Sequence, residues 1–156
     1  MARILIVDGF EAIRYLFRDF LSEDYGHDIV LASTSGEAIS ILKEDKAIDL
    51  VILGGFILRD ERRHTLYSER GSFVAAFIRE SLWRGQQGVN RPLFVTACLD
   101  ACEIEGAAGV FSKAELVKNL CSFDDDNWIN GVLRKNGIEV PPPRKRLPLP
   151  DRRPSP

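Results

Sequence analysis

The sequence is poor in the residues that build disulfide frameworks and metal sites. Its 156 residues include three cysteines and two histidines, and no two cysteines form a CxxC pair. Three cysteines do not make an even disulfide set, and so few sulfur and imidazole ligands disfavour a zinc site. We expect the thiols to be buried or idle.

Long apolar runs and a secretory leader are also missing. No hydrophobic stretch approaches the roughly 18 residues that a membrane span needs, and the chain enters a strand pattern directly after Met1-Ala2. The hydrophobic fraction of 45% and the charged fraction of 28% are ordinary for a globular protein. The sequence therefore predicts one soluble, cytoplasmic domain around a single core, with no membrane segment.

Proline is nearly absent before residue 141, where Pro92 stands alone, whereas residues 141–156 hold the other seven. These sixteen residues carry five basic side chains and one aspartate, a balance of +4, so the net charge of −2 leaves −6 for the remainder. We predict a folded domain at 1–140 and a disordered tail at 141–156 with polyproline II character. The tail resembles a proline-rich recognition ligand, with a plain flexible end as the alternative.

The domain alternates between strand and helix patterns. Apolar runs at 4–7, 50–53 and 93–95 are typical of parallel strands that are buried on both faces, and further strands are expected at 28–32 and 110–112. Segments of helical period separate them: Leu16 is expected on the buried stripe of the first helix, Phe73 on that of the third, Ser35 as the cap of the second and Gly137 as the end of the last. This alternation implies right-handed crossovers and a parallel sheet.

Residues 55–70 break the pattern. They carry Arg59, Arg62, Arg63 and Arg70 among acidic residues and show little periodicity, which predicts an exposed loop or a short helix. We expect this stretch to cover or rim the carboxyl ends of the strands. It is either a functional insertion, such as a partner-binding lid or an anion site, or a solvated loop of mixed charge.

The residues at the strand ends carry a family resemblance. Asp8-Gly9 follow the first apolar run, Gly54 the third and Thr96 the fourth, while Lys113 follows the fifth strand. In these motifs the chain resembles the receiver domain of bacterial two-component response regulators, over roughly residues 2–135. The resemblance implies an α/β fold of the flavodoxin-like kind: a doubly wound, five-stranded parallel sheet of order 2-1-3-4-5 with helices on both faces.

The resemblance also shows what this pocket lacks. Family members place two acidic residues after the first strand and a phosphoaccepting aspartate after the third, where this chain has Asp8-Gly9 and Gly54. Phosphoryl transfer to a carboxylate needs that nucleophile and a Mg²⁺ ion held by oxygens. We therefore expect phosphorylation to be lost and Mg²⁺ binding to be lost or weak. Asp60 is a poor replacement acceptor, because it lies six residues beyond the strand end.

Thr96 and Lys113 are the surviving donors of the family pattern. They either keep a phosphate-binding role, or Thr96 serves strand geometry alone and Lys113 pairs with Asp8, which is the favoured interpretation. The resemblance places a switching aromatic residue three positions before the lysine, where this chain has Val110. A β-branched valine is stiff and has no ring to turn, and the adjacent Phe111 is expected to pack in the core.

The sequence thus predicts a receiver-like signalling protein that is neither an enzyme nor bound to a cofactor and that acts through protein–protein interaction without phosphorylation. The resemblance implies a histidine kinase, another response regulator or a second copy in a homodimer as partner, bound near Asp100, Val110, Phe111 and the last helix. We expect no DNA-binding domain. The alternatives are a small-molecule or nucleotide-binding module that uses the emptied pocket, and a phosphorelay output protein with an unusual acceptor.

Overall fold

The computed structural model describes residues 1–54, 57–58, 68–69, 71–80, 92–98, 104–112 and 128–142. Several predicted features lie outside these residues: Asp60, Asp100, Lys113 and the tail beyond residue 142. Within the described part of the chain, no helix has both the length and the apolar character needed to cross a membrane.

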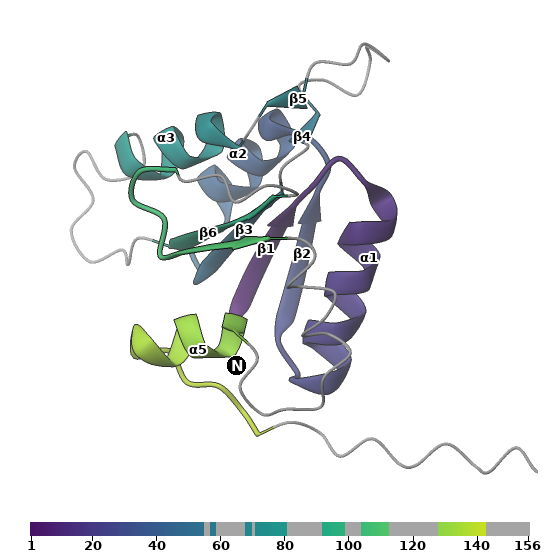
Figure 1. Ribbon diagram of the computed structural model, residues 1–156, viewed down its shortest axis with the longest axis vertical. Helices are drawn as coiled ribbons and strands as arrows, with labels where there is room; N and C mark the ends of the chain where they lie inside the picture. The colour runs from purple at the N-terminus through teal and green to yellow at the C-terminus, as the bar shows by residue number, and fades with distance from the viewer. Residues whose placement is uncertain are drawn as a thin grey trace, which may run out of the picture.

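A five-stranded parallel sheet lies at the centre of the molecule (Figure 1). Its strands are β1 (Arg3–Val7), β2 (Asp28–Ala32), β3 (Leu50–Gly54), β6 (Leu93–Cys98) and β7 (Gly109–Ser112). They are arranged in the order β2-β1-β3-β6-β7. Numbered among themselves, these strands follow the order 2-1-3-4-5, so the predicted fold class and topology are confirmed.

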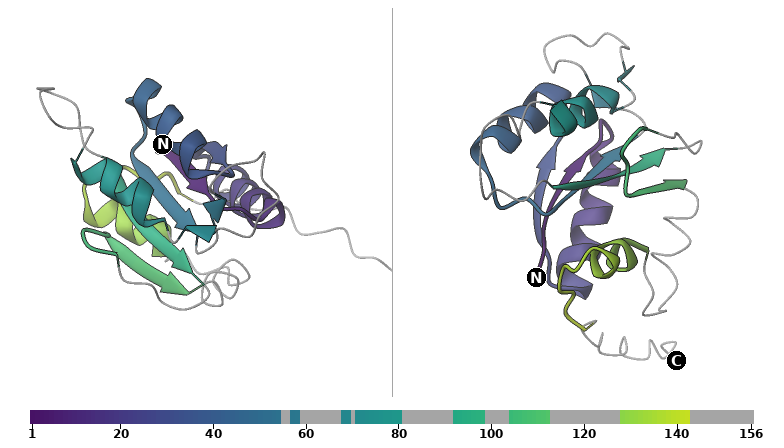
Figure 2. Two further views of the ribbon diagram at one scale, coloured as in Figure 1. Left: turned by 90° about the horizontal axis from the view of Figure 1, so that it is seen from above. Right: turned by 90° about the vertical axis from the view of Figure 1, so that its left-hand side faces the viewer.

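Helices cover both faces of the sheet (Figures 1 and 2). One face carries α1 (Glu11–Asp19), its π-helical continuation η1 (Phe20–Asp24) and α5 (Trp128–Lys135), whereas the other carries α2 (Ser35–Glu44) and α3 (Ser72–Glu80). Successive strand residues point to opposite faces, so each strand contributes to two separate cores. This arrangement explains why the central strands are continuous apolar runs rather than alternating ones.

The two cores divide the strand residues as this alternation requires. Leu5 and Val51 pack with α2 and α3, while Ile4 and Ile52 pack with α1 and α5, and all four are fully buried or nearly so, at 0–1% exposure. Burial of each such side chain contributes about 1.5–3 kcal/mol. The sheet is therefore held from both sides, and its strand ends are positioned rigidly.

Two helix ends show how local chemistry sets the boundaries. Thr34, and not the predicted Ser35, is the N-cap of α2: its backbone is extended and its Oγ1 accepts a hydrogen bond of 3.1 Å from the Glu37 N–H. Ser35 is already helical. After α5 the predicted stop at Gly137 is confirmed, because this residue has a φ of 76° and the next N–H, that of Ile138, donates to the Leu133 carbonyl at 3.0 Å.

Three expectations about burial and loops are corrected. Leu16 and Phe73 are not core residues, since they are 43% and 63% exposed; the apolar stripe of α1 is wider than one helix can bury against a sheet, and Phe17 takes the buried place. The expected loop at 55–70 holds two short antiparallel strands, β4 (Ile57–Leu58) and β5 (Ser68–Glu69). Ile57 is fully buried, so the base of this ribbon is part of the core.

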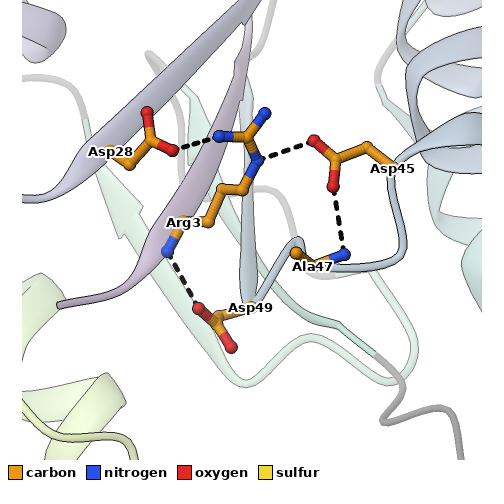
Figure 3. A network of polar contacts seen from close by, with 5 residues as sticks. All are labelled: Arg3, Asp28, Asp45, Ala47 and Asp49. Atoms are coloured by element: carbon orange, nitrogen blue, oxygen red, sulfur yellow. Dashed lines mark hydrogen bonds and ion pairs between the residues drawn. The ribbon is translucent and has the colours of Figure 1, made fainter.

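Arg3 joins several segments at the amino-terminal edge of the sheet (Figure 3). Its backbone N–H donates to Asp49 Oδ2 at 2.8 Å, its Nε donates to Asp45 Oδ2 at 2.6 Å, and its Nη1 pairs with Asp28. Asp45 also accepts from the Ala47 N–H at 3.0 Å. The carboxylates of Asp45, foremost, and of Asp28 raise the pKa of Arg3 above its ordinary value. The contacts tie the start of β1 to the starts of β2 and β3 and to the chain that follows α2.

Two glycines, one within α5 and one just after it, test where this helix ends. Gly131 lies within α5 and Gly137 just beyond it, and an added β-carbon would meet no atom within 4 Å at either position. Gly131→Ala is expected to stabilise the protein by about 0.5–1 kcal/mol, because alanine favours the helix. Gly137→Ala is expected to destabilise it by about 1–2 kcal/mol, because its φ of 76° disfavours a side chain. Urea denaturation of both variants measures the difference, and equal effects would contradict the assignment of this helix end.

Candidate functional site

Three of the predicted site residues lie near the carboxyl edge of the sheet. Asp8 directly follows β1, Gly54 ends β3 and Thr96 lies near the end of β6. The register pairs Val7 with Leu53, so Asp8 and Gly54 are the next neighbours across β1 and β3. Ligand sites of doubly wound sheets lie beyond this edge.

The carboxylate of Asp8 fills the space above Gly54. A β-carbon built on Gly54 in ideal geometry would lie 2.1 Å from Asp8 Oδ2, 2.6 Å from its Cγ and 2.9 Å from its Cβ. Real β-carbons do not approach other atoms this closely, so any side chain at position 54 would displace Asp8. The acceptor position is therefore both without a nucleophile and sterically occupied.

Asp8 is held in this place by bonds to three other segments. Its Oδ1 accepts from the Phe10 N–H at 2.9 Å and its own N–H donates to the Ala32 carbonyl at 3.1 Å. The Asp8 carbonyl accepts from Arg14 Nη1 at 2.7 Å. Asp8 is only 2% exposed. Its side chain thus shapes the turn that leads from β1 into α1, in the manner of an Asx turn.

Arg14 is a site residue that the sequence pattern did not predict. A basic residue on the polar side of an amphipathic helix is ordinarily solvated, but the guanidinium of Arg14 reaches back to the end of β1. No sequence signal separates these cases, because the contact depends on where α1 packs on the sheet.

Gly9 follows Asp8 and supplies no second carboxylate. In the described segments no group of three or more histidine, cysteine, aspartate or glutamate side chains could hold a metal ion. Mg²⁺ prefers several oxygen ligands, and among the described residues at the strand ends Asp8 is the acidic one. Weak or absent Mg²⁺ binding stays a prediction.

Thr96 and Val110 are direct neighbours. Thr96 is fully buried in β6, and the parallel register pairs it with Val110 of β7. The structure thus places Val110 beside the threonine, while Phe111 points to the other face and packs partly buried against the core under α1 and α5. A β-carbon on Gly109 would lie 2.5 Å from Phe111 Cε2, so the ring of Phe111 folds back over that glycine. Lys113 and Asp100 are outside the described residues, and their roles stay predictions.

The strand order and the helices on both faces of the sheet define the class of protein. It is a doubly wound parallel sheet in which the first, third and fourth parallel strands place Asp8, Gly54 and Thr96 near the same edge. No family model and no curated protein matches the sequence.

Similar solved structures show which doubly wound fold this is. A response regulator receiver domain protein from Clostridium thermocellum has a TM-score of 0.56 at 18% identity, with 88% of this chain and 98% of that chain covered. The N-terminal domain of a response regulator/sensory box/GGDEF protein from Carboxydothermus hydrogenoformans reaches a TM-score of 0.60 at 15% identity, with 86% and 96% covered. The chain therefore has the fold of response regulator receiver domains.

Two other structures with this fold were solved with bound groups or partners. A response regulator from Thermotoga maritima, in complex with Mg(2+)-BeF, has a TM-score of 0.53 at 24% identity, with 77% of this chain and 99% of that chain covered. The complex of the P1 domain of CheA3 with CheY6 from R. sphaeroides contains a chain with a TM-score of 0.50 at 18% identity, with 76% and 93% covered.

The contact between Asp8 and Gly54 can be measured by a double-mutant cycle. Gly54→Ala is expected to destabilise the protein by about 1–3 kcal/mol, because the new methyl group must displace a buried carboxylate. In an Asp8→Ala background the same change is expected to cost much less, because the obstructing group is gone. Chemical denaturation of the four proteins gives the coupling. Additive effects of the two substitutions would show that the carboxylate does not occupy this volume.

Proposed function

We propose that this chain is a receiver-like signalling protein that acts by binding another protein and does not depend on aspartyl phosphorylation. The observation that carries the proposal is the Asp8 carboxylate lying over Gly54. The chain has the receiver-domain fold, but the position that would accept a phosphoryl group has no side chain and no space for one. A domain of this kind transmits information through its surface.

The chemistry of Asp8 supports this proposal. Its carboxylate is 2% exposed, accepts the Phe10 N–H and is wedged against Gly54. A replacement acceptor would need an open approach for the phosphodonor and a bound cation to neutralise the transferred group. A buried carboxylate that is already engaged in a turn is poorly placed for that task.

The pair of Thr96 and Val110 supports a conformation that phosphorylation does not switch. In the family pattern an aromatic residue beside the threonine turns between two positions. Valine is branched at its β-carbon, is stiff about χ1 and has no ring. Thr96 is already fully buried beside Val110. The surface formed by β7 and α5 would then keep one shape, set by packing or by a partner.

A protein partner fits this shape better than a small ligand. The carboxylate of Asp8 takes the space next to Gly54 at the end of β3, which disfavours the alternative of an emptied pocket that binds a nucleotide or a small molecule. CheY6 in its complex with the P1 domain of CheA3 illustrates a protein partner for this fold. We propose a histidine kinase, another response regulator or a second copy of this chain as the partner, in the cytoplasm.

Exposure to a small phosphodonor tests the loss of phosphorylation. Incubation with acetyl phosphate and Mg²⁺ is expected to leave the intact mass unchanged, because position 54 has no nucleophile and Asp8 is engaged. A receiver domain with its acceptor aspartate serves as the positive control. If one phosphoryl group is added, the variants Asp8→Asn and Asp60→Asn locate it, and loss of the adduct in either variant would overturn the proposal.

Affinity capture tests the binding role. The full chain is expected to retain its partner equally well with and without phosphodonor. Lys135→Glu on the exposed face of α5 is expected to weaken capture severalfold, whereas the matched change Lys43→Glu on α2 is not, because α2 covers the opposite face of the sheet. Capture by a chain that ends at residue 140 separates the domain from the tail. A partner that binds only in the presence of phosphodonor would refute phosphorylation independence.

A further inference from the structure

His27 is a buried histidine at the junction of three segments. It lies between η1 and β2 and is 3% exposed. Its Nδ1 accepts from the Ala2 N–H at 3.2 Å, and its Nε2 lies 3.0 Å from Asn130 Oδ1 of α5. The ring also stacks on Tyr25, with ring centres 6.4 Å apart. The imidazole thus connects Ala2, which directly precedes β1, with α5. Asn130 lies 103 residues after His27 in the sequence.

The partners of the ring define its protonation. A backbone N–H can only donate, so the nitrogen that faces Ala2 carries no proton. The proton of the neutral ring is therefore on Nε2, from which it is donated to the amide oxygen of Asn130. The neutral imidazole, with one donor and one acceptor, matches both neighbours.

Protonation would break this match. A second proton on Nδ1 would place an N–H against the N–H of Ala2, so that two donors face each other. The site would also have to hold a charge inside a core. Burial is the main cause that lowers the pKa of His27, whereas the hydrogen bond to Asn130 raises it. Among the described residues, the charged groups that act on the ring are the α-amino group of Met1, which opposes protonation, and Asp49, which favours it.

The side chains of α5 pack in the same hydrophobic core as Ala2, whose N–H donates to this ring. Ile129 and Leu133 of α5 are 1% and 0% exposed, and they pack in the same cluster as Ala2. Ile138 and Val140, in the segment after α5, pack against the cluster as well. The hydrogen bond that His27 accepts from the Ala2 N–H and the one that it donates to Asn130 therefore lie between the sheet and α5.

We propose that His27 is a pH-sensitive clamp, which in its neutral form holds α5 and the segment after it against the sheet and which on protonation releases them. The opening is local, because α2 and α3 pack on the other face of the sheet, in a separate core. This clamp does not rest on the proposed function, but it would make the α5 surface respond to acidification.

The sign of the effect follows from proton linkage. Because the pKa of His27 is lower in the closed form than in an open one, the open form binds more protons as the pH falls. The clamp is fully effective above about pH 6.5, the ordinary value for histidine, and weakens below it. Between about pH 7.5 and about pH 5.5 the open population of α5 is expected to rise by at most about tenfold, the limit in which the closed form takes up no proton.

Hydrogen exchange of the full chain measures this opening. The protection of α5 amides, corrected for the intrinsic effect of pH, is expected to fall by up to about tenfold over that range, while α2 amides keep theirs. His27→Gln is expected to abolish the fall, because its amide offers one donor and one acceptor but does not titrate. His64→Gln, which replaces the other histidine of the chain, is the matched control and is expected to keep the fall.

Two results would overturn the clamp. One is protection of α5 that stays in proportion to that of α2 throughout the titration; the other is an acid response that persists in His27→Gln. Should His27→Gln fail to fold, the wild-type ring is titrated by nitrogen NMR, with His64→Gln used for assignment. Shifts of α5 amides at the same midpoint as His27 would then support the proposal, and shifts at a different midpoint or none would refute it.

Discussion

The carboxylate of Asp8, pressed against Gly54, is the constraint on which the character of this protein depends. It has two structural roles: it shapes the turn into α1 by accepting from the Phe10 N–H, and it occupies the volume that a side chain at position 54 would need. Because the interior is closely packed, the Asp8 carboxylate and a side chain at position 54 cannot occupy this volume together. The carboxyl edge of the sheet, which carries the site in this fold, has become part of the core.

The opposite edge of the sheet holds the polar contacts that join distant parts of the chain. Arg3 binds carboxylates from β2 and from the loops before β3, and His27 links the first strand to α5. The Arg3 contacts are partly exposed and are screened by water, whereas the imidazole is buried and its hydrogen bonds depend on its charge. The edge without the site is therefore the one that can respond to solution conditions.

The sequence predicted the elements better than their orientation. Three continuous apolar runs placed the central strands, and Gly137 marked the end of α5 by the conformation that a left-handed turn requires. Leu16 and Phe73 were placed in the core because periodicity counts apolar residues and does not show how wide a stripe the sheet can cover. The ribbon of β4 and β5 was missed because two-residue strands leave no periodic signal.

Sequence alone determined the fold class and the absence of an acceptor at position 54, since both follow from local pattern and residue identity. The tertiary structure decided which group lies next to position 54, namely the carboxylate of Asp8. The contact of Asp8 with Gly54, the hydrogen bond of Arg14 to the end of β1 and that of His27 to Asn130 join residues that are from 6 to 103 positions apart and belong to different segments. Such contacts depend on the distances between packed helices and strands, and no local pattern encodes those distances.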